Sequence, residues 1–117
     1  MSSLELEKSK IHVVVEIVQY LPHAIVSKTI VKKITGNIVA SSFDAGEEQG
    51  EIITPYDNFI QIIDGNAQVL LKDKVFQLTI GEGMVIPAHV NHSFKAKEPF
   101  KMISTMIKSG LDDKIVV

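Results

Sequence analysis

The chain has 117 residues, a formal net charge of −2 and no cysteine. This length suits a single domain, and a chain of this size buries roughly two-thirds of its extended surface, so it can form a core without cross-links. The lack of cysteine excludes disulfides, thiolate metal sites and a cysteine nucleophile. All twelve basic residues are lysines that form no basic stripe, which argues against nucleic acid as a partner.

The apolar residues indicate strands rather than membrane-spanning helices. Sixteen isoleucines and thirteen valines outnumber seven leucines, and β-branched side chains favour extended backbone. No apolar run approaches the ~20 residues of a membrane span, and the acidic first eight residues hold no cleavable apolar stretch. We therefore expect a cytoplasmic protein with no membrane partner.

The predicted elements, in chain order, are short strands separated by turns rich in Gly, Asn, Asp and Pro. Segment 12–18 fits either an edge strand or a short helix. Residues 25–34 and 38–43 form a hairpin around a turn at 35–37, and 44–51 is a solvated acidic loop before a strand that begins near Ile52. Further strands are expected at 59–63, 67–71, 75–80, 84–86, 92–97 and 100–107, with tight turns at 64–66 and 72–74. About nine strands without a crossover helix predict an all-β antiparallel sandwich or barrel.

Two glycine-punctuated blocks resemble the two motifs of the cupin superfamily. The first motif places two histidines and a glutamate between two glycines, and the matching positions are Gly46, Ile52, Thr54, Asn58 and Gly65. The second motif, with its glycine, proline and histidine, is matched in spacing by Gly81, Pro87, His89, His92 and Ala96. The chain is thus similar to a small single-domain cupin of the type-2 conserved-barrel, RmlC-like kind.

This resemblance implies a double-stranded β-helix, or jelly-roll barrel, in one domain over residues 1–117. The N-terminal arm would cover about 1–24 and the barrel about 25–108. It also implies that the family's metal ligands would stand at Ile52, Thr54, Asn58 and His92. Only His92 retains a ligand of the family pattern, so the metal-binding motif is degenerate.

A metal centre of this kind needs three or four converging nitrogen and oxygen donors, and one imidazole does not supply them. We therefore expect the protein to lack stoichiometric metal. The alternative is a metal-dependent oxygenase or isomerase, in which nickel, iron, zinc or manganese binds a set drawn from His92, His89, Glu51 and Asn58. A local bulge would have to turn Glu51 inward, and His89 fits an exposed loop better than a ligand position.

Without a metal, the interior is apolar with a few hydrogen-bonding groups. That description suits a small-molecule pocket and equally a packed core. No catalytic residue is identified. The candidate lining residues are Ile52, Thr54, Asn58, Ile60, Gln61, Ile62, Met84, Ile86, His92, Met102, Ser104 and Met106.

The leading hypothesis is a cupin of unassigned activity that binds a small organic ligand and forms a homodimer. The dimer is expected because 45% of the residues are hydrophobic and only 22% are charged, and because open sheet edges need cover. The alternatives are the metal-dependent enzyme and a ligand-sensing domain that acts with a separate partner protein.

Overall fold

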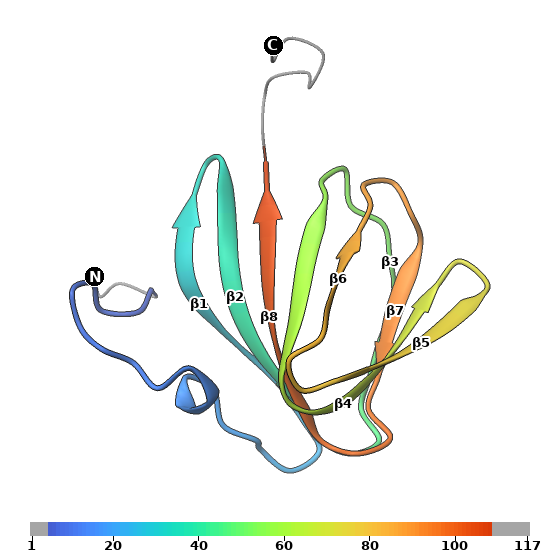
Figure 1. Cartoon of the computed structure of the whole chain (residues 1–117), viewed down its shortest axis with the longest axis horizontal. Helices are drawn as coiled ribbons and strands as arrows, with labels where there is room; N and C mark the ends of the chain where they lie inside the picture. Colours follow the sequence, from blue (N-terminus) through green and yellow to red (C-terminus); the bar gives the residue numbers. More distant parts are fainter. Residues whose placement is uncertain (1–4, 109–117) are drawn as a thin grey trace, which may run out of the picture.

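Residues 5–108 are described in a computed structural model of the chain, and nearly all of their regular structure is β-strand (Figure 1). A single 3-10 turn, η1, covers Val14–Glu16 in this range. The eight strands of the described part are β1 (Ile25–Lys33), β2 (Gly36–Phe43), β3 (Glu48–Ile52), β4 (Asn58–Leu71), β5 (Lys74–Thr79), β6 (Gly83–Ile86), β7 (His92–Lys95) and β8 (Phe100–Ile107). No helix within 5–108 is long and apolar enough to cross a membrane. The ends of the expected domain, 1–4 and 109–117, lie outside the described residues.

The strands form two antiparallel sheets that share β4. The first sheet runs in the order β1, β2, β8, β4, β6, and the second in the order β3, β7, β4, β5. Residues 58–65 of β4 pair in the first sheet, and residues 66–71 pair in the second. In Figure 1 the strands curl into an open half-barrel, with β1 at one side and β5 at the other. The prediction of an all-β antiparallel architecture is confirmed.

Strand β4 is continuous where the sequence predicts a tight turn at 64–66, so that prediction is wrong. Gly65 has a φ of +70°, in the left-handed region that costs other residues roughly 1–2 kcal/mol. A side chain at Gly65 would also overlap the carbonyl oxygen of Pro99. The glycine therefore carries the strand from the first sheet into the second instead of reversing it.

Other predicted boundaries differ from the structure. β3 ends at Ile52, where a strand was expected to begin, and it includes much of the predicted acidic loop. Its Glu48 is paired with Lys95 of β7, so acidic residues that suggested a loop belong to a paired edge strand. Segment 12–18 contains only η1. The β1–β2 hairpin is confirmed, although its turn comes slightly before the predicted one.

The core lies between the two sheets, and β4 contributes more of its residues than any other strand. Phe43 and Phe100 stack with ring centroids 4.4 Å apart, and Phe94 packs against Phe43 at 6.3 Å. Full burial of such a side chain contributes about 1.5–3 kcal/mol, so this cluster holds the sheets together. The buried cluster comprises Phe43, Ile60, Ile62, Ala67, Val69, Leu78, Ile86, Phe94, Ala96, Phe100 and Met102.

The N-terminal arm, meaning the described residues before β1, packs on the face of the first sheet that points away from the second. Val18 of the arm is buried. Lys101 of β8, itself 6% exposed, donates from Nζ to the carbonyl oxygen of Val15 at 2.7 Å. The hydroxyl of Tyr20 donates to Oδ2 of Asp64 at 2.6 Å. Because a buried ammonium group needs such partners, the arm belongs to the folded structure.

Candidate functional site

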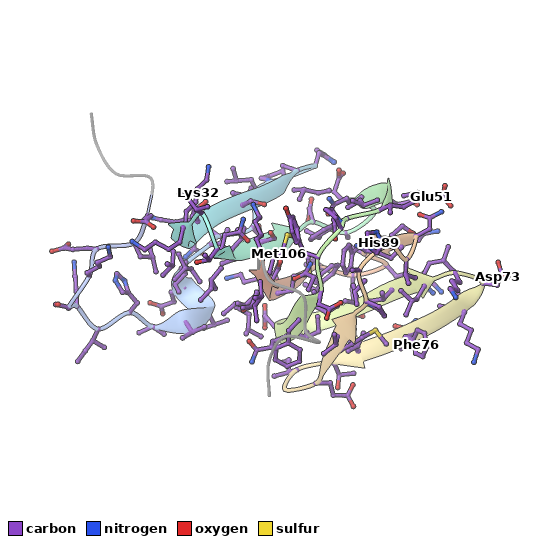
Figure 2. All side chains as sticks on the ribbon, turned by 90° about the horizontal axis from the view of Figure 1, so that it is seen from above. Lys32, Glu51, Asp73, Phe76, His89 and Met106 are labelled. Atoms are coloured by element: carbon purple, nitrogen blue, oxygen red, sulfur yellow. The ribbon has the colours of Figure 1, made fainter. Side chains whose placement is uncertain are left out.

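A hollow of about 300 Å³ lies between the two sheets, beside the core. One wall comes from β1, β2, β4 and β8, and the other from β3, β7 and the loop that follows β3. In Figure 2, Met106 lies near the middle of the molecule, between the sheets. The lining residues are Ser27, Asn37, Val39, Ser41, Gln49, Ile52, Thr54, Asn58, His92, Phe94, Met102, Ser104 and Met106.

Strand register brings these side chains to one face of each sheet. Residues opposite each other in neighbouring strands point to the same side. In the first sheet, Ser104 lies opposite Val39 of β2. In the second sheet, His92 lies opposite Ile52 of β3. The hollow is therefore assembled from alternate residues of strands that are far apart in the sequence.

The structure places the predicted lining residues in two groups. Residues Ile52, Thr54, Asn58, His92, Met102, Ser104 and Met106 line the hollow. Ile60, Ile62 and Ile86 belong to the buried core, as Met102 also does, and Met84 packs against that core. Gln61 is exposed, as expected for alternation between two inward-facing neighbours of β4. The space between the sheets is thus packed toward β4–β6 and hollow toward β2 and β3.

Six lining residues were not foreseen from the sequence. Most of them precede the first cupin-like motif, so the spacing of that motif does not predict them. The alternation of Asn37, Val39 and Ser41 within β2 was the available signal, because it places one side chain in every two on the same face. The missed residues are Ser27, Asn37, Val39, Ser41, Gln49 and Phe94.

His92 is 4% exposed and held in one orientation. Its Nδ1 lies 3.0 Å from the carbonyl oxygen of Val90. A carbonyl oxygen only accepts hydrogen bonds, so Nδ1 carries a proton, and in the neutral form of the ring Nε2 is then an acceptor. The ring meets Phe94 edge to face at 5.7 Å. His92 therefore brings an oriented acceptor nitrogen to the hollow.

The neutral polar side chains of the hollow form hydrogen bonds in pairs. Ser104 Oγ donates to Asn58 Oδ1 at 3.0 Å. The hydroxyls of Ser27 and Ser41 lie 2.9 Å apart. In each pair some donor or acceptor capacity remains, because a hydroxyl has one proton and two lone pairs. The first sheet thus offers both donors and acceptors to the hollow.

Thr54 differs from these pairs, because its hydroxyl is used locally. Thr54 Oγ1 donates to the carbonyl oxygen of Tyr56 at 2.9 Å, and the Thr54 carbonyl oxygen accepts from the backbone N–H of His89 at 2.7 Å. The residue therefore stabilises the loop after β3 and ties it to the loop between β6 and β7. Thr54 therefore contributes to the hollow as part of a loop whose conformation is fixed by these hydrogen bonds.

Glu51 and His89, proposed from the sequence as metal ligands with His92, do not line the hollow. Both are exposed, and Figure 2 shows Glu51 at the periphery of the molecule. The pairing register of β3 does shift between Gln49 and Ile52, but these two residues line the hollow while Glu51 stays outside. Within residues 5–108, no group of three or more His, Cys, Asp or Glu is placed to hold a metal ion.

A larger depression of about 460 Å³ lies between the β4–β5 turn and the loop after β6. Leu71, Phe76, Pro87 and Val90 form its apolar floor. Its charged side chains belong to the exposed turn at 72–74. They do not converge on a buried point, so the smaller hollow at His92 is the better candidate for a specific site.

The chain was compared with protein families, with curated proteins and with solved structures. No family model and no curated protein matches the chain. A conserved protein of unknown function from Streptococcus pyogenes superposes with a TM-score of 0.86 at 26% identity, over 95% of this chain and 98% of that one. A cupin superfamily protein from Desulfitobacterium hafniense gives 0.84 at 21% identity, over 92% and 100% of the two chains.

A third solved structure, a cupin 2 conserved barrel domain protein from Leptotrichia buccalis, is 32% identical with a TM-score of 0.78. The match covers 80% of this chain and 46% of that protein, so this chain spans about half of its length. With the two-sheet antiparallel topology, these likenesses show that the chain is a small protein of the cupin fold. The resemblance seen in the sequence is thereby confirmed, and no particular activity comes with it.

Proposed function

We propose that this cupin binds a small organic molecule in the hollow beside His92, without a divalent metal ion. The observation that carries the proposal is the hollow itself, where neutral hydrogen-bonding groups from both sheets converge on an apolar floor. Its volume of about 300 Å³ lies at the lower end of the range for ligand pockets, roughly 300–1,000 Å³. A small ligand suits that size.

The donor set argues against a metal ion. Of the four side chains at the cupin ligand positions, only His92 supplies an imidazole nitrogen, and Ile52 supplies hydrocarbon. The Asn58 oxygen accepts from Ser104, and the Thr54 hydroxyl donates to a carbonyl. Divalent ions bind where several anionic or imidazole ligands converge. We therefore propose that the metal-binding motif is degenerate and that the ligand contacts the protein directly.

Elemental analysis of protein purified without chelator tests the metal-free part. We expect far less than one equivalent of nickel, iron, zinc or manganese, and no change of metal content in His92→Ala. Near one equivalent that disappears in His92→Ala would overturn the proposal and favour the metal-dependent enzyme. Native mass spectrometry of the same preparation reports any organic molecule that copurifies.

We further propose a homodimer that buries the part of the outer face of the first sheet that the N-terminal arm leaves exposed. Register aligns Ile38, Thr105, Phe59 and Val85 in one row across four strands. Phe59 is 40% exposed and Val85 56% exposed, and neither residue is next to a charge in this row. Two copies can cover such an uncharged face by packing it against itself about a two-fold axis.

Sedimentation velocity tests the dimer. Val85→Glu is expected to give monomers, because two glutamates would face each other across the two-fold contact. Gln77→Glu, an equally exposed change on β5, is the control and should leave the dimer intact. A wild-type protein that is monomeric at micromolar concentration would contradict the proposed dimer.

From the composition, we also propose that the protein is cytoplasmic.

A further inference from the structure

The hollow lacks charged side chains, which limits what it can bind. None of its thirteen described lining residues is Asp, Glu, Lys or Arg, although 22% of the residues in the chain are charged. A buried ionic ligand loses its hydration, and it binds only where an opposite charge or several aimed dipoles replace that hydration. The lining therefore disfavours carboxylates, phosphates and amines as ligands.

The same lining is rich in neutral hydrogen-bonding groups on both walls. The first sheet contributes the Ser27–Ser41 pair, the Asn58–Ser104 pair and Asn37, while the second contributes Gln49 and the acceptor Nε2 of His92. Among the described residues, none forms a hydrogen bond with His92 Nε2. Groups that both donate and accept complement hydroxyls, because each hydroxyl also does both.

Apolar surface completes the lining. Phe94, Met102 and Met106 stand among the polar groups. A polyol or sugar ring presents C–H faces between its hydroxyls, and those faces bury well against an aromatic ring or a thioether. A purely apolar ligand would leave the serine and amide groups without partners at a cost, so it fits less well.

We propose that the hollow selects a neutral polyhydroxylated molecule, such as a free monosaccharide or cyclic polyol, with His92 Nε2 accepting from one of its hydroxyls. This inference rests on the proposed function and names the ligand class of the same site. It implies discrimination by charge: a sugar should bind, and the matched uronic acid and amino sugar of the same ring should not.

Methyl NMR on protein with labelled methionines tests this directly. Met102 and Met106 line the hollow, while Met84 packs against the core and is an internal control. A panel of neutral hexoses and cyclic polyols is titrated beside the matched uronates and hexosamines. Shifts of the Met102 and Met106 methyls with neutral members only, and an unmoved Met84 methyl, are the expected result.

A serine variant ties the binding to the wall. Ser104→Ala should weaken the best neutral ligand about threefold to tenfold, the usual effect of losing one neutral hydrogen bond. Gln77→Ala, at an exposed position of β5 outside both the hollow and the proposed dimer face, is the control and should leave affinity unchanged. Thermal denaturation of both variants confirms that they fold.

The outcomes separate this inference from the proposed function. Equal or tighter binding of the charged analogues overturns the ligand class, while metal-free binding of an organic molecule stands. If no polyol moves the two methyls, the ligand class is likewise overturned. The proposed function itself fails if the protein holds stoichiometric metal at His92, or if a crystal structure shows side chains packed into the hollow in place of any ligand.

Discussion

Ile52 and His92 are direct partners across the antiparallel pair of β3 and β7. A hydrocarbon side chain thus stands beside the imidazole, where the cupin motif places a second histidine. Thr54 and Asn58, at the other two ligand positions, line the same hollow. The four positions of the cupin motif thus share one hollow, and this relationship leads to the first prediction.

Restoring the donors should restore metal binding. The triple variant Ile52→His, Thr54→His, Asn58→Glu should bind nickel or zinc at about one equivalent, since it offers three imidazoles and a carboxylate. Isothermal titration measures the stoichiometry. The same triple variant with His92→Ala is the control and should bind far more weakly. A folded triple variant that takes up no metal would show that the four positions do not converge.

The bend in β4 gives a stability prediction. Gly65→Ala should lower the free energy of unfolding by more than the ~1–2 kcal/mol of a left-handed alanine, because its Cβ would also meet the Pro99 carbonyl. Gly46→Ala is the matched control, since Gly46 has a φ of +87° and open space around it. In urea unfolding, Gly65→Ala should therefore lose clearly more unfolding free energy than Gly46→Ala. Equal losses would refute the close approach.

The arm gives a third prediction through Tyr20. Tyr20→Phe removes the hydrogen bond to Asp64 and should cost about 1 kcal/mol in urea unfolding. Tyr56→Phe is the control, because the contacts recorded for Tyr56 involve its ring and its backbone carbonyl. If both variants lose the same stability, the Tyr20–Asp64 bond does not hold the arm in place.

The same bond makes stability depend on pH. Burial, and then the hydrogen bond to Asp64, raise the pKa of Tyr20 well above its ordinary value of 10.0. A raised folded-state pKa contributes stability that is complete below about pH 10 and is lost as the pH climbs above it. The stability difference between wild type and Tyr20→Phe should therefore shrink above pH 10. A difference that grows there would contradict this assignment.

The sequence predicts most of the fold, because strand and turn signals are local. The bounds of β8, Phe100–Ile107, coincide with the predicted ones, and the β1–β2 hairpin follows from the turn residues around Thr35. β4 was misjudged because Asp64, Gly65 and Asn66 have the composition of a tight turn. What keeps β4 continuous there is pairing with β8, in which Asp64 and Gly65 lie opposite Lys101 and Phe100, and local composition does not report such pairing.

The sequence predicted residues of the site only where the cupin-like motifs specify ligand positions. The cupin spacing led to Ile52, Thr54, Asn58 and His92, all of which line the hollow. It offered nothing for Ser27 and its neighbours in the first hairpin, which come before the motif begins. The division of the interior into packed and hollow halves depends on the register between sheets, and a single sequence does not contain that information.

A high-resolution crystal structure of the protein, purified without chelator and soaked with the best neutral polyol, tests the central claim most directly. We predict an organic ligand between the sheets, bonded to His92 Nε2 and the Ser104 hydroxyl, with no anomalous signal from a metal ion. A metal ion bound to His92, or side chains packed into the hollow in place of any ligand, would contradict it.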